Sequence, residues 1–66
     1  MTITVNGEPR QLPEEHTVAA LLAELKLDPV GVDVAINMKV VPRSEHPHRK
    51  ISSGDRVDVI RAVGGG

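Results

Sequence analysis

Polar and apolar residues alternate at the start of the chain, and this period of two predicts a β-strand with one buried face. Met1, Ile3 and Val5 lie on one side of it, with Thr2 and Thr4 on the other. Branching at Cβ, as in Ile, Val and Thr, adds to the preference for extended backbone. We therefore expect residues 1–5 to form a strand that packs one face on a core.

A tight turn is predicted next, because Asn6-Gly7 tolerates the positive φ angles of a hairpin loop. The returning strand is expected over residues 10–12. Pro9 has no N–H to donate, so it is expected in the loop or on an unpaired edge. Loops of two or four residues would both place Leu12 on the face of Ile3, and the pattern leaves that choice open.

The apolar period changes after Thr17, the predicted N-cap of a helix. An apolar stripe with helical spacing indicates a helix of about ten residues that packs on a sheet. We expect this helix to end at Asp28-Pro29, with Gly31 beyond it. The stripe consists of Val18, Leu21, Leu22 and Leu25.

The rest of the chain predicts a second hairpin, an irregular connection and a last strand. Strands are expected over residues 32–36 and 39–41, joined by a turn at Asn37-Met38. Pro42 ends the second of these strands, and residues 43–45 are expected to make a single turn. Ile51 is expected as an isolated core anchor, followed by a turn cluster at residues 52–55. The last strand is predicted over residues 56–63.

These elements predict an α+β fold. Two hairpins separated by one helix can bury the apolar stripe of that helix only if both hairpins join one sheet. The first and last strands would then pair at the centre, with the helix lying across one face. That arrangement is a β-grasp, or ubiquitin-like, roll with a mixed sheet of about four to five strands. We assign residues 1–63 to this domain and residues 64–66 to a flexible glycine tail.

Composition excludes several classes of function. The 66 residues suffice for one small domain and include no Cys, Phe, Tyr or Trp. Disulfides, thiolate metal ligands and aromatic platforms for single-stranded nucleic acid are therefore excluded. A net charge of -1 without a basic block gives no footprint for a phosphate backbone. Without a signal-peptide pattern or a long apolar run, we expect a cytoplasmic protein, monomeric when free, that binds neither membranes nor nucleic acid.

The polar residues suggest no catalytic centre. His46 and His48 lie in a proline-broken loop without the fixed spacing of a zinc site, and with His16 they are interpreted as solvated loop residues. Asp55 and Asp58 would point to opposite faces of a strand, so they are interpreted as turn and surface residues. We expect no metal site, no bound cofactor and no stand-alone enzymatic activity.

The end of the sequence, Val63-Gly64-Gly65-Gly66, offers the one unusual chemical group. An α-carboxylate is ionised at neutral pH, and glycines without Cβ atoms can thread a channel too narrow for other residues. Gly66 is therefore predicted to present its carboxylate to another enzyme, with Gly64 and Gly65 needed for threading. A frayed end without a function is the alternative.

Short motifs connect this pattern to a known family. Ala35-Ile36-Asn37, Val40-Val41-Pro42-Arg43, Gly54-Asp55-Arg56-Val57 and the closing glycines resemble the ThiS family, the ubiquitin-like sulfur carriers of thiamine biosynthesis. The resemblance implies that an adenylyltransferase related to ubiquitin-activating enzymes, using ATP and Mg²⁺, activates the carboxylate of Gly66. It further implies that a cysteine desulfurase supplies sulfur to form a thiocarboxylate, which thiazole synthase consumes.

Partner binding is predicted along the strand that leads to the tail, at Ile60, Arg61, Ala62 and Val63. Simple packing at the end of a strand is the alternative for these residues. Alternatives for the whole chain are a sulfur carrier for molybdopterin or cysteine synthesis, a protein modifier joined to lysines through Gly66, and a β-grasp module that binds its partner without covalent chemistry.

Overall fold

A computed structural model describes residues 1–28 and 30–61 of the chain. Its elements follow the predicted order of a hairpin, a helix, a second hairpin, a short helical turn and a last strand. They are β1 (Thr2–Val5), β2 (Glu8–Gln11), α1 (Val18–Glu24), β3 (Val32–Ile36), β4 (Lys39–Val41), the 3₁₀ turn η1 (Arg43–Glu45) and β5 (Arg56–Arg61). No helix within these residues is long and apolar enough to cross a bilayer.

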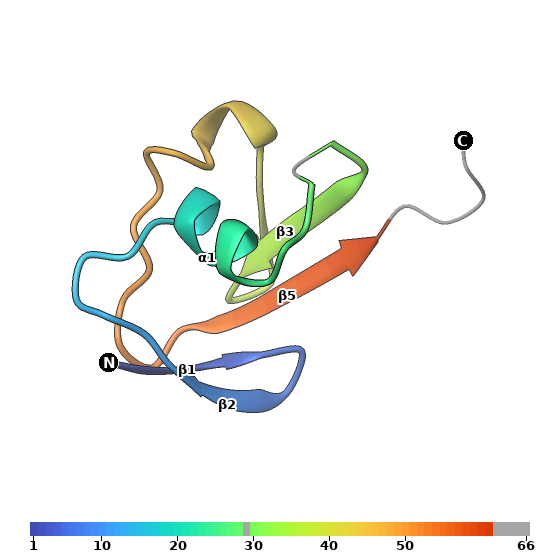
Figure 1. The fold of residues 1–66 in the computed structure, drawn as a ribbon. Helices are drawn as coiled ribbons and strands as arrows, with labels where there is room; N and C mark the ends of the chain where they lie inside the picture. Colours follow the sequence, from blue (N-terminus) through green and yellow to red (C-terminus); the bar gives the residue numbers. More distant parts are fainter. Residues whose placement is uncertain (29, 62–66) are drawn as a thin grey trace.

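The five strands form one mixed sheet in the order β2-β1-β5-β3-β4. The last strand, β5, lies at its centre, parallel to β1 and antiparallel to β3. Helix α1 lies across one face of the sheet (Figure 1) and leaves the other face uncovered. This is the predicted β-grasp roll.

The first hairpin has a two-residue loop, which settles the choice that the sequence left open. Asn6 and Gly7 both have positive φ angles, 52° and 84°, and Val5 pairs directly with Glu8. The second strand therefore begins at Glu8, two residues before the predicted start. Pro9 lies on the edge strand β2, where its missing N–H leaves no ladder bond unmade.

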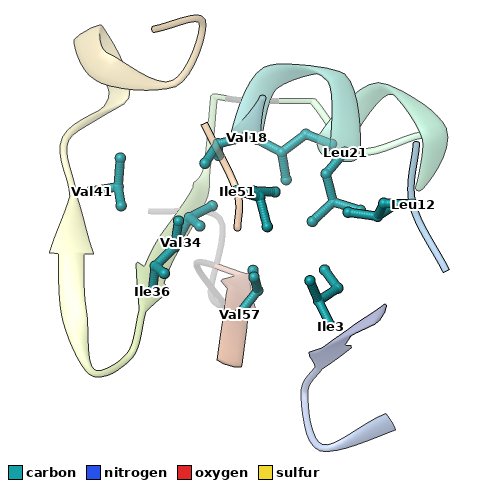
Figure 2. Packing of buried hydrophobic residues seen from close by; sticks show 10 residues of the cluster. Ile3, Leu12, Val18, Leu21, Val34, Ile36, Val41, Ile51 and Val57 are labelled. Carbon is teal, nitrogen blue, oxygen red and sulfur yellow. The ribbon is translucent and has the colours of Figure 1, made fainter. Parts of the chain in front are cut away.

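The core lies between α1 and the sheet, and it consists of aliphatic side chains alone. Figure 2 shows the helix residues directed toward those of the strands. The predicted anchor Ile51 is 3% exposed and fills this core, as Leu12 does on the face of Ile3. Within residues 1–28 and 30–61, ten apolar residues are buried: Ile3, Leu12, Val18, Leu21, Leu22, Val34, Ile36, Val41, Ile51 and Val57.

The first three N–H groups of α1 are hydrogen-bonded, and two of them donate to a distant loop. The hydroxyl of Thr17, the predicted N-cap, accepts from the N–H of Ala20 at 3.1 Å. The N–H of Val18 donates to the carbonyl of Arg49, and that of Ala19 to the carbonyl of His46, both at 3.0 Å. Because the first N–H groups of a helix have no partner within it, these bonds fix the loop after η1 against the helix.

The helix is shorter than predicted, with seven residues instead of about ten. It stops because Lys26 adopts a left-handed conformation, with φ of 57°. The N–H of Lys26 then donates to the carbonyl of Ala23, and that of Leu27 to the carbonyl of Leu22. This pair of bonds is a Schellman motif, which usually has glycine at the left-handed position. A lysine there gives no sequence signal, so the prediction placed the end too late.

We predict that Lys26→Gly raises the free energy of unfolding by about 0.5–1 kcal/mol, because glycine adopts a left-handed conformation without the steric cost that Lys26 bears. Urea unfolding followed by circular dichroism measures the change. Ala20→Gly, inside the helix, is the control and is expected to lower stability by about 1 kcal/mol. Equal destabilisation by both substitutions would contradict this account of the helix end.

Candidate functional site at the end of strand β5

Strand β5 carries the chain from the centre of the sheet to the predicted site. On one side β3 pairs with it to its end, from Ile36 opposite Val57 to Val32 opposite Arg61. The described residues end at Arg61. The other predicted site residues, Ala62, Val63, Gly64, Gly65 and Gly66, lie outside them, as does the predicted domain boundary after residue 63.

On its other side β5 has a shorter partner. Strand β1 pairs with it only at Thr4 and Val5, opposite Arg56 and Val57. Asn6 then continues the contact from the hairpin loop. Its N–H donates to the carbonyl of Val57 at 2.9 Å, and its side-chain Oδ1 accepts from the N–H of Val59 at 2.8 Å.

The second hairpin attaches to the start of β5 in the same way. The N–H of Asn37 donates to the carbonyl of Arg56 at 2.8 Å, and its Oδ1 accepts from the N–H of Arg56 at 3.0 Å. Its Nδ2 also donates to Asp55 at 3.1 Å. Each hairpin thus uses a left-handed asparagine to hold β5, one at its start and one near its end.

Ile60 lies on the uncovered face of the sheet, as its predicted binding role requires. It is 59% exposed and sits opposite Asp33. Since side chains alternate along a strand, Ile60 shares this face with Asp58. Val40 lies on the same face, because Ala35 pairs with Asp58 on one side and with Val40 on the other. The face is therefore mildly apolar, with carboxylates beside its exposed isoleucine.

A hollow on the opposite, helix-bearing side of the sheet was not predicted. It has a volume of about 440 Å³ and lies beside the end of β5. Its apolar lining includes Val5, Val59 and Leu27, and the side chains of Arg10 and Arg61 border it. The sequence does contain a signal for it, because both arginines occupy positions that alternation assigns to the buried face, where the helix is already too short to cover them.

The histidines correct one prediction. His46 is not a solvated loop residue; it is 2% exposed. Its Nε2 lies 3.2 Å from the carbonyl oxygen of Val41, and because that oxygen can only accept, Nε2 donates. The loop bonds to α1 draw this residue inward. His16 is not a solvated residue either: its side chain is 14% exposed and contacts Glu24. The carboxylate of Glu24 also lies 3.9 Å from the guanidinium of Arg10. His48 is exposed, and no three potential metal ligands gather within residues 1–28 and 30–61.

The two aspartates have structural roles, as predicted. Asp55 accepts hydrogen bonds from the N–H of Ser52 at 2.8 Å and from Asn37, so it closes the turn before β5. Asp58 lies on the uncovered face, 3.4 Å from the guanidinium of Arg56. Both carboxylates are occupied by contacts that shape or border β5.

Comparison with known proteins gives the family. The ThiS family model matches residues 3–66. The sulfur carrier protein ThiS of Escherichia coli is 30% identical over 66 residues, which are the full length of both chains. A protein named thiazole synthase, from Paramagnetospirillum magneticum, is 36% identical over 66 residues; these are all of this chain but only 20% of that protein.

A solved structure agrees with these matches. The crystal structure of a thiamine biosynthesis protein (ThiS) from Geobacter metallireducens superposes with a TM-score of 0.85 and 33% identity, covering 100% of each chain. Its likeness extends over the hairpins, the helix and β5 alike. The chain described here belongs to the ThiS family.

Proposed function

We propose that this protein is a sulfur carrier of thiamine biosynthesis that carries sulfur as a thiocarboxylate on Gly66. The full-length match to curated sulfur carriers is the observation that supports this most strongly. In the proposal the reacting group is the carboxylate of Gly66. The carrier supplies no catalytic group of its own; it is the co-substrate of partner enzymes.

The proposed chemistry begins at the carboxylate. A ubiquitin-activating-like adenylyltransferase with ATP and Mg²⁺ joins it to AMP and releases pyrophosphate. A mixed anhydride has a good leaving group, so a persulfide supplied through a cysteine desulfurase displaces AMP at the acyl carbon and forms an acyl disulfide. A thiol then cleaves its S–S bond, which releases the sulfur on the carrier and leaves a disulfide between the thiol and the donor. The product is a thiocarboxylate, which is softer and more nucleophilic than the carboxylate it replaces. The need for ATP and for reduced sulfur favours the cytoplasm as the place of reaction.

Thiazole synthase is the proposed acceptor of the sulfur. The similarity of this chain to a part of a protein named thiazole synthase supports this choice over molybdopterin or cysteine synthesis. In that relative a segment like this chain belongs to the same polypeptide as the rest of the synthase. A freely diffusing carrier would have to bind its synthase through its own surface.

That surface, in the proposal, is the end of β5 with Ile60 and Arg61, followed by Ala62 and Val63, and the glycines at 64 and 65 thread the partner's channel. The exposure of Ile60 on the face that α1 leaves uncovered supports this. Burying an exposed aliphatic side chain gives affinity that a solvated strand end would not.

We predict that incubation with the adenylyltransferase, MgATP, cysteine and a cysteine desulfurase replaces one oxygen of the protein by sulfur. Intact-mass spectrometry measures the replacement, and fragmentation places it on Gly66. Omission of ATP is the control. An unchanged mass, under conditions that convert the E. coli carrier, would refute the proposal. Conversion without transfer to thiazole synthase would favour one of the other sulfur pathways.

A second prediction concerns the tail. Deleting Gly65 and Gly66, or adding one alanine after Gly66, is expected to abolish thiocarboxylate formation and leave the thermal unfolding midpoint unchanged. Both changes move the carboxylate, whereas the core lies entirely within residues 3–57. If the extended protein is still converted, the sulfur site is not the carboxylate of Gly66.

A third prediction tests the binding surface. Ile60→Lys is expected to raise the KM for the carrier in adenylation by about tenfold, because an apolar anchor is replaced by a charge. The new lysine would lie opposite Asp33 and form a favourable cross-strand charge pair. The free energy of unfolding should therefore change by less than about 0.5 kcal/mol. Met38→Lys is the matched control, since Met38 is 80% exposed at the opposite end of the sheet. Equal KM values for both variants would exclude Ile60 from the interface.

A further inference from the structure

The end of β5 is held unequally on its two sides. Strand β3 pairs with it as far as Arg61, but β1 stops at Val5, opposite Val57. Beyond that level the β1 side depends on the hairpin loop alone. The last bond there is the one from the N–H of Val59 to Oδ1 of Asn6, at 2.8 Å. Within residues 1–28 and 30–61, no backbone or side-chain hydrogen bond reaches β5 on this side beyond Val59.

We propose that Asn6 is a positioning residue for sulfur transfer: by fixing Val59 it sets the direction of the chain at Ile60 and Arg61, the residues that precede 62–66 in the sequence. The inference rests on the proposed function. Asn6 touches no reacting atom, and it acts through the backbone of β5. Only Ile60 and Arg61 follow Val59 in the described chain. The bond from Asn6 therefore restrains β5 close to its last described residue.

The chemistry of this position favours asparagine. Its φ of 52° is left-handed, where asparagine and glycine are tolerated better than other residues. Asparagine adds a short side chain with an acceptor oxygen, which takes the place that a carbonyl of a longer β1 would occupy. Glycine would keep the loop and the backbone bond to Val57 but lose this acceptor. Aspartate would keep both.

Asn37 provides an internal control. It has the same φ of 52° and holds Arg56, at the opposite end of β5, through the same pair of bonds. It also bonds Asp55, so its loss removes one more contact than the loss of Asn6 does. If both asparagines only stabilise the fold, Asn37→Gly should raise the KM for the carrier at least as much as Asn6→Gly. If Asn6 is a positioning residue, Asn6→Gly should raise this KM more.

The experiment compares full-length wild type, Asn6→Gly, Asn6→Asp and Asn37→Gly in the thiocarboxylate-forming reaction with MgATP. We expect Asn6→Gly to raise the KM for the carrier about five- to tenfold with kcat little changed, since the lost bond must be made up on binding. Asn6→Asp is expected to have the wild-type KM. Asn37→Gly is also expected to have the wild-type KM, but to unfold at a lower temperature than the wild type. Amide ¹⁵N relaxation should show increased motion at Ile60 and Arg61 only in Asn6→Gly.

The outcomes separate this inference from the proposed function. If wild type forms no thiocarboxylate, the proposed function fails. If wild type reacts but Asn6→Gly has the same KM, or Asn37→Gly raises KM equally, the positioning role is wrong and the carrier function stands. A raised KM in Asn6→Gly that Asn6→Asp does not restore would also overturn it, because the acceptor oxygen would then not be the cause.

Discussion

The structure depends on one requirement: the backbone of β5, at the centre of the sheet, must be hydrogen-bonded on both sides. Buried N–H and C=O groups without partners are costly, so a central strand is stable only with a neighbour on each side. Here the neighbours come from opposite ends of the sequence, one from each hairpin. Helix α1 connects the two hairpins, and residues 42–55 connect β4 to β5. The core fills the space between these connections and the sheet.

The two asparagines show how short hairpins meet this requirement. Strand β1 has four residues and β5 has six, so neither hairpin loop could be replaced by an arbitrary turn without leaving β5 groups unpaired. Asn6 and Asn37 each serve twice, because the residue that makes the left-handed turn also supplies a side-chain acceptor to β5. Turn geometry and sheet formation are thus coupled at the same two positions.

Much of the fold could be predicted because local and global signals agree. The glycine after Asn6 marks the first hairpin, and the alternation around Ile3 and the helical stripe around Leu21 identify the core. What failed lacked a local signal. Lys26 ends the helix in a conformation that composition does not mark, and His46 is buried only because its loop bonds to a helix that lies far away in sequence. The hollow bordered by Arg10 follows from the short helix, and its only signal in the sequence is that alternation assigns this arginine to the buried face.

The site divides in the same way. Ile60 could be predicted as exposed because strand alternation is a local rule, whereas the bond between Asn6 and Val59 joins residues 53 positions apart and has no sequence signature. This difference bears on function. In the proposed function the chain end is offered to partners, so the body must fix where that end starts, and here the hydrogen bonds to the backbone of β5 do so. Because β3 already holds one side of β5 as far as Arg61, the direction of the strand at that end depends on the weaker side, where the side chain of Asn6 makes the last hydrogen bond within the described residues.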